Sequence, residues 1–170
     1  VTGTDRGPDS AGIALYGASE GSSFKVTVQS DDPATGFNGL AAHLSAATGS
    51  PCRIEEKSTH AVISTDGDNA EKLVAHLRDA HSALRIMSTG DSMEIYKEVG
   101  LPRDVAARFN INQMSGAHGI GHTRMATESA VTTMGAHPFS TGADQCLVHN
   151  GSLSNHTSPR RRLRRNGVHI

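Results

Sequence analysis

The sequence lacks the composition that marks several large classes of protein. Charged residues make up 19% of its 170 positions and nearly cancel, to a net charge of -1. This balance excludes a global attraction to nucleic acid, to an anionic membrane or to an acidic substrate. No apolar run approaches the roughly eighteen residues that a membrane helix needs. The chain is long enough to bury a core, so we expect a globular protein whose partners are recognised by local features.

Cysteine is also scarce, since the chain has only Cys52 and Cys146. The two lie far apart, form no CxxC pair and follow no secretory signal, so we expect no disulfide framework and a cytoplasmic setting. Tryptophan is absent, whereas the chain has 18 glycines and 10 histidines, and most of the histidines follow position 115. Glycine permits unusual backbone angles and histidine titrates near neutrality, which predicts a loop-rich site in the carboxy-terminal third.

Apolar patterns predict a chain of mixed helices and strands. A short buried strand is expected at 11–16, and six segments in the order βαββαβ are expected to follow it. Their strands are predicted at 24–29, 53–57, 60–65 and 84–87, and their helices at 36–47 and after a cap at Asp68. The helices should bury four leucines: Leu40, Leu44, Leu73 and Leu77. This order is that of the ferredoxin-like arrangement, in which two helices cover one face of a four-stranded sheet.

The rest of the chain is expected to belong to a second unit. A strand at 93–99 and a helix beginning at Pro102 should lead back to it. A strand should then run into a loop at Arg124, followed by a loop over 129–139 and a buried strand at 145–149. The last element is predicted to be an arginine-rich helix, capped by Ser154 or Asn155 and ended by Gly167.

Two short stretches, Gly121-His-Thr-Arg124 and His149-Asn-Gly151, carry the clearest chemical signal. Arginine offers a planar fork of donors that suits a carboxylate, and an asparagine amide beside a glycine N–H is a natural pair of oxyanion donors. Together they indicate acyl chemistry on a small substrate with a carboxylate. A surface arginine at a strand end and an Asn-Gly hairpin turn would explain the same residues without any activity.

Four motifs occur in a fixed order, and together they resemble one family. They are Arg6-Gly-Pro-Asp-Ser-Ala-Gly12, Gly121-His-Thr-Arg-Met-Ala-Thr127, His137-Pro138 and His149-Asn-Gly151. The combination resembles the glutaminase domain of class II glutamine amidotransferases, the N-terminal-nucleophile family that includes glutamate synthase. The stretches Glu94–Gly100 and 124–131 are closest to the amidotransferase-like subunit of glutamate-synthase-like and N-methylglutamate synthase complexes.

The resemblance implies a fold and a domain organisation. The expected fold class is α/β (α+β): an incomplete N-terminal-nucleophile (Ntn) hydrolase αββα sandwich with a ferredoxin-like insertion. Residues 1–18 and 116–170 would form the partial glutaminase domain, and residues 19–115 the inserted subdomain. The function implied is hydrolysis of the glutamine side-chain amide to glutamate and ammonia, which a partner synthase would use. No cofactor or metal is implied.

The resemblance also implies a role for each motif residue. Arg124 would bind the α-carboxylate of glutamine with help from Thr127. Asn150, through its side-chain amide, and Gly151, through its backbone N–H, would form the oxyanion hole. The remaining motif residues would shape the pocket: Arg6, Asp9 and His137. Met125 and Glu128 stand where the family usually has tryptophan and histidine, so glutamine contacts on that side are expected to differ.

In the family a cysteine at the mature amino terminus attacks the amide and uses its own α-amine as the base. We expect this cysteine upstream of Val1, both chain ends to be truncations, and the 170-residue chain to be inactive. Cys52 and Cys146 are expected to be structural, because neither has a free amine beside it. The alternative is a pseudo-amidotransferase, a binding or assembly subunit that uses the inserted subdomain as its interaction module.

Two further signals have ordinary explanations. His118 and His122 are four residues apart, but Gly119 and Gly121 disfavour the helix that would bring both rings to a metal. The arginine run at 160–165 is more typical of a solvated helix face than of a nucleic-acid site, because no aromatic residues interleave it.

Overall fold

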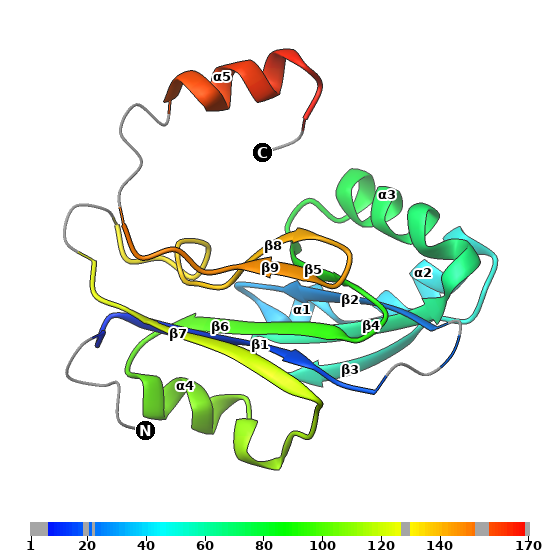
Figure 1. The fold of residues 1–170 in the computed structure, drawn as a ribbon. Helices are drawn as coiled ribbons and strands as arrows, with labels where there is room; N and C mark the ends of the chain where they lie inside the picture. Colours follow the sequence, from blue (N-terminus) through cyan, green and yellow to red (C-terminus); the bar gives the residue numbers. More distant parts are fainter. Residues whose placement is uncertain (1–6, 19–20, 22, 127–129, 152–156, 169–170) are drawn as a thin grey trace.

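The structure is a computed structural model that describes residues 7–18, 21, 23–126, 130–151 and 157–168. These residues form a mixed α and β fold with a three-stranded sheet, a four-stranded sheet and a two-stranded hairpin (Figure 1). Within the described part of the chain, no helix is long and apolar enough to cross a membrane.

The three-stranded sheet has β1 (Ser10–Tyr16) at its centre, between β6 (Met93–Val99) and β7 (His118–Arg124). Both neighbours run antiparallel to β1, and the register places Gly12 between Lys97 and His122. Helix α4 (Pro102–Arg108) covers one face, and the 3-10 turn Ile111–Gln113 follows it. Proline opens α4, where its missing N–H costs nothing. The expected strands at 11–16 and 93–99 and the helix at Pro102 are confirmed.

The four-stranded sheet is antiparallel throughout and has the order β3-β4-β2-β5. Its elements are β2 (Ser23–Gln29), α1 (Pro33–Gly36), α2 (Leu40–Thr48), β3 (Arg53–Lys57), β4 (His60–Asp66), α3 (Ala70–Ala80) and β5 (Arg85–Gly90). The four leucines of α2 and α3 are buried against Val26, Val28 and Ile63 of the sheet. The predicted βαββαβ order and the burial of the four leucines are therefore confirmed.

Both helices of this unit begin later than predicted. Gly39 adopts a left-handed conformation with φ of 68°, so the helix expected at 36–47 begins only at Leu40, and the short helix α1 precedes it at 33–36. Asp32 caps α1 by accepting a hydrogen bond from the Thr35 amide at 3.4 Å. Asp68 is not a helix cap, because it lies in the 3-10 turn Gly67–Asn69 that precedes α3.

Strand β6 pairs with β1, although it follows directly on β5 of the four-stranded sheet. An apolar cluster joins the two sheets, with Val62 of β4 against Tyr96 of β6 and Phe109 after α4. The strand and helix after residue 92 thus pack with β1 and β7. The division of the chain into domains at 18 and 116 stays a prediction.

The carboxy-terminal region differs most from expectation. The hairpin consists of β8 (Phe139–Gly142) and β9 (Gln145–Leu147), and only the second strand was predicted. That strand is not buried, since Leu147 is 53% exposed. Asn150 and Gly151 lie after the hairpin and not in its turn. Helix α5 (Thr157–Arg165) has no buried residue, and Gly167, whose φ is 76°, follows in the turn after it. Its predicted caps, Ser154 and Asn155, lie outside the described residues.

Candidate functional site

One face of the three-stranded sheet carries Arg124, and the loop that bears His137 crosses this face at Gly12. Side chains alternate along a strand, so Gly12, Lys97 and His122, which are paired across the sheet, share a face. Arg124 lies two residues beyond His122 on the same face. A Cβ on Gly12 would collide with the carbonyl oxygen of His137 and with Cβ of Lys97. Glycine is therefore required where residues 130–138, called the 130–138 loop below, cross the sheet.

The first motif holds the end of β7. The Asp9 amide donates to the Arg124 carbonyl at 3.1 Å, and the Asp9 carboxylate accepts from the Ala126 amide at 2.7 Å. Gly7 lies so close to the strand that a Cβ there would be 2.7 Å from the Arg124 nitrogen. Asp9 thus acts on the backbone around Arg124. Arg6 and Thr127 lie outside the described residues.

The 130–138 loop brings His137 to the same face. The ring of His137 lies 4.5 Å from the ring of His122, centroid to centroid. Burial, followed by the charges of His122, Lys97, Arg124 and His149, lowers the pKa of His137 to about 4. Burial and the charge of Arg124 also lower the pKa of His122. His137 is therefore a neutral imidazole at neutral pH.

Contacts of the loop bring the second and third motifs together. A Cβ on Gly135 would lie 3.5 Å from Nη1 of Arg124, so the loop passes directly beside the guanidinium. His149, the first residue of the last motif, is among the charges that lower the pKa of His137. Asn150 and Gly151 follow His149 and are exposed. The guanidinium of Arg124, with the neutral imidazole of His137 close to it, can bind a small carboxylate.

Lys97 was missed by the sequence reasoning, although it is central to this face. Its side chain is buried, its Nζ donates to backbone carbonyls of the 130–138 loop, and it lies 4.7 Å from the centroid of the Phe139 ring. One signal was present in the sequence. Lys97 shares a strand face with Met93 and Ile95, both buried, so alternation alone places a lysine on an apolar face.

Neither cysteine lies at the candidate site. Cys52 is buried in the core of the four-stranded unit, where its thiol lies 3.7 Å from Oγ1 of Thr48. The Cys146 thiol accepts a hydrogen bond from the Tyr16 hydroxyl at 3.5 Å, and burial together with this contact raises the pKa of Tyr16 to about 12. Tyr16 is at the opposite end of β1 from Ser10, which pairs with Arg124. Cys146 is half-buried, not enclosed in a buried strand as expected.

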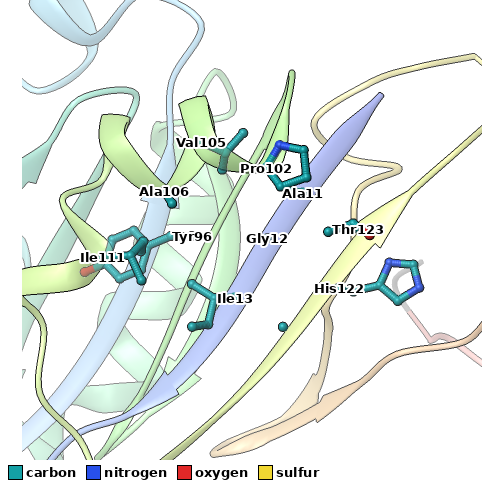
Figure 2. A pocket seen from close by; sticks show the side chains of 11 residues that line it. Ala11, Gly12, Ile13, Tyr96, Pro102, Val105, Ala106, Ile111, His122 and Thr123 are labelled. Carbon is teal, nitrogen blue, oxygen red and sulfur yellow. The ribbon is translucent and has the colours of Figure 1, made fainter. Parts of the chain in front are cut away.

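A cavity of about 320 Å³ lies on the other face of the sheet, between β1, β7 and α4 (Figure 2). Its lining is mainly apolar and also includes His122 and Thr123. Because side chains alternate along a strand, Ile13 and Thr123 lie on the cavity face of the sheet, whereas Lys97 and Arg124 lie on the opposite face. Figure 2 shows Ile13, Tyr96, Val105 and Ile111 around it.

The histidines of β7 are packed against aromatic rings. His118 stacks on Tyr16 at 4.2 Å between centroids, and His122 lies against His137. In the ranges that the structure describes, no group of three or more His, Cys, Asp or Glu side chains is placed to hold a metal ion.

No family model matches the chain. Similarity to individual proteins is extensive: the chain is 58% identical to the glutamine amidotransferase-like protein GlxB of Rhizobium meliloti over 99% of its own length and 56% of that protein. A candidate glutamine amidotransferase of Methanothermobacter thermautotrophicus is 30% identical over 95% of this chain and 56% of its own. These matches support a glutamine amidotransferase family for the chain.

A more distant match is partial. The glutamine–fructose-6-phosphate aminotransferase (isomerizing) of Streptococcus pyogenes is 36% identical over 80 residues, which are 46% of this chain and 13% of that enzyme. The chain spans about half the length of the first two relatives, at 56% of each.

Proposed function

We propose that the chain is the glutamine-binding part of a class II glutamine amidotransferase, which releases ammonia from glutamine for a partner synthase. One observation carries the proposal: the loop before β1, the end of β7 and the 130–138 loop converge around Arg124 and His137. The sequence motifs assign these same residues to glutamine. The proposed partner is a synthase subunit of a glutamate-synthase-like complex, which would use the ammonia.

In this proposal each group acts on a different part of the substrate. Arg124 binds the α-carboxylate with its planar fork of donors, assisted by Thr127. A thiolate adds to the side-chain amide carbon, and Asn150 and Gly151 stabilise the oxyanion that forms. The tetrahedral intermediate collapses, ammonia leaves with the proton taken up by the α-amine, and water hydrolyses the glutamyl thioester. Arg6 and His137 shape the pocket, while Asp9 fixes the backbone after Arg124.

The thiolate in this mechanism belongs to neither cysteine of the chain. Cys52 lies in a separate apolar core, and Cys146 lies at the far end of β1 from Arg124. By the resemblance, the nucleophile would be the amino-terminal cysteine of the mature protein, and residues 1–170 would supply the binding of glutamine and the stabilisation of the oxyanion. Replacing Cys52 or Cys146 by serine should leave the glutaminase activity of the full-length protein intact.

The two sheets would belong to two different structural units of such an enzyme. The three-stranded sheet with α4 on one face would be part of the Ntn-type sandwich, and the four-stranded unit would be the ferredoxin-like insertion. The order β3-β4-β2-β5 and the packing of α2 and α3 on one sheet face support the second assignment. Because β6 pairs with β1, we place the boundaries of the inserted sheet at 23 and 90.

The test is glutaminase kinetics of the full-length protein. Asn150→Ala removes one oxyanion donor, so we expect kcat to fall by about a hundred- to a thousandfold with a smaller change in KM. Arg124→Ala removes the carboxylate fork, so we expect chiefly a higher KM. Normal kinetics in both variants would show that the site is assigned wrongly.

The alternative is a pseudo-amidotransferase that binds partners without hydrolysing glutamine. The separate core of the four-stranded unit favours it, because such a unit can serve as an interaction module. The same assay separates the two proposals. A full-length protein that binds glutamine but releases no ammonia would support the binding role.

A further inference from the structure

Three backbone carbonyls of the 130–138 loop point at one buried ammonium group. Nζ of Lys97 donates to Ala136 O at 2.9 Å, to Pro138 O at 3.2 Å and to Met134 O at 3.4 Å. Lys97 is only 3% exposed. An ammonium has three donors, and a buried one must use them to offset the loss of water. Here all three N–H donors are directed to carbonyls of residues 134–138, the segment that contains His137.

Glu98, the next residue of β6, binds the same loop through its carboxylate. The carboxylate of Glu98 accepts a hydrogen bond from the Thr133 hydroxyl through Oε1. Its other oxygen accepts from the Thr59 hydroxyl at 2.9 Å, and Nη1 of Arg108 lies 3.7 Å away. Glu98 is 8% exposed, so the loss of any of these partners would leave a poorly solvated charge.

We propose that Lys97 and Glu98 are positioning residues that together clamp the 130–138 loop over the face of Arg124. The inference rests on the proposed function, since it concerns the same glutamine site. Neither residue touches the substrate in this scheme. Both act through the loop, which carries His137 and passes beside the guanidinium at Gly135.

Strand β6 is well placed for this role. It is an edge strand of its sheet and pairs with β1, so its backbone is fixed while its side chains reach the loop. Thr59 lies in the turn between β3 and β4, so Glu98 also connects the loop to the four-stranded sheet. The clamp therefore joins three segments that are far apart in the sequence.

The first experiment measures amide hydrogen exchange in the full-length protein. The Ala136 amide donates to Thr132 O at 3.1 Å and should be protected while the loop is closed. Lys97→Met keeps the length and removes the charge, and loss of charged hydrogen bonds typically costs enough to speed local opening by about tenfold or more. We expect this acceleration at residues 132–138 and not in α2 or α3. Unchanged exchange in the loop would overturn the clamp.

A second variant keeps the test decisive if Lys97→Met does not fold. Thr133→Val removes the hydroxyl that binds Glu98 and keeps a side chain of similar volume at this half-buried position. It should also accelerate exchange of the loop. The matched control is Lys25→Met. Lys25 of β2 lies 3.0 Å from the carboxylate of Glu94, which is on β6 like Lys97, but this pair does not contact the 130–138 loop. Loop exchange in the control should equal that of the wild type.

Kinetics separate this inference from the proposed function. If the wild-type protein is a glutaminase, Lys97→Met should raise the KM for glutamine by about tenfold, with a smaller change in kcat. A residue that served only global stability would lower the active fraction and leave KM unchanged, which would contradict the clamp. If the wild type releases no ammonia, the proposed function fails, and the exchange measurement still decides whether Lys97 holds the loop.

Discussion

Gly12 is the residue at which the sheet and the loop above it come closest. A methyl group there would meet the His137 carbonyl and Cβ of Lys97, both parts of fixed backbone segments. We therefore predict that Gly12→Ala destabilises the protein by about 1–3 kcal/mol, the usual cost of overpacking. It should also raise the KM for glutamine, because the loop with His137 must move. Urea unfolding and glutaminase kinetics of the full-length protein measure the two effects.

Gly121 provides the matched control for this substitution. It lies on the neighbouring strand, and a Cβ there would meet only the Gly12 carbonyl, at 3.8 Å, on the side of the cavity. Gly121→Ala should therefore leave both the stability and the KM close to those of the wild type. Equal losses in the two variants would mean that any side chain at a glycine of these strands is destabilising, and that contact with the crossing loop is not the cause.

The sequence could name residues that carry a motif, but it could not name a residue whose partners are distant backbone carbonyls. Arg124, Asp9 and His137 could be named because their order along the chain resembles a known site. Lys97 could not, because its partners are carbonyl oxygens some forty residues further along. Such contacts depend on tertiary structure and leave no trace in residue spacing.

The β8–β9 hairpin is attached to the rest of the fold by Asp144. Its carboxylate accepts from the amides of Asp91, Ser92 and Met93 at 2.8–2.9 Å, in the turn between β5 and β6. Burial opposes ionisation of Asp144, but these three amides outweigh it and lower the pKa. This one charged side chain thus ties the turn of the hairpin to the turn between β5 and β6.

We predict that Asp144→Asn destabilises the protein by about 2 kcal/mol, because a neutral amide has one acceptor oxygen and no charge. Asparagine tolerates the positive φ of 54° at this position, so backbone strain does not contribute. Urea unfolding at pH 7 gives the difference. The exposed Asp91 supplies the control: Asp91→Asn leaves its amide in place and should change stability by much less.

Element prediction succeeded where apolar residues recur with a clear spacing or form a run. Strand β2 follows from alternation, β4 from its apolar run, and the buried faces of α2 and α3 from helical spacing. It failed at Gly39, whose left-handed conformation divides a region of continuous helical spacing. It also failed at β8, because this exposed strand pairs only within a hairpin and so has no alternating apolar pattern in the sequence.

The two sheets of the molecule meet around a buried histidine. His60 of β4 is fully buried, with its ring 4.8 Å from that of Phe109 and 6.1 Å from that of Tyr96. Its Nδ1 lies 3.1 Å from the Thr59 hydroxyl, while Nε2 has no hydrogen-bond partner in the described part of the chain. The contact between the sheets therefore tolerates a neutral imidazole and opposes a charged one.

This arrangement makes the stability of the whole molecule depend on pH. Burial lowers the pKa of His60 to about 4, although the charge of Glu98 acts in the opposite direction. As the pH falls below about 6.5, the unfolded chain takes up a proton that the folded chain does not. The free energy of unfolding should therefore decrease between pH 6.5 and pH 4, by an amount on the order of 3 kcal/mol at most from this residue.

His60→Phe tests the prediction, because phenylalanine fits the aromatic cluster but cannot titrate. Urea unfolding of both proteins at pH 7.5 gives the difference without a contribution from protonation, because His60 is largely uncharged there in both the folded and the unfolded chain. The same measurement from pH 6.5 down to pH 4.5 should show a shallower loss of stability in the variant, because one proton-binding group of the unfolded chain has been removed. Parallel curves over this range would mean that His60 is protonated equally in both states, and the joint between the sheets would then accept a charge.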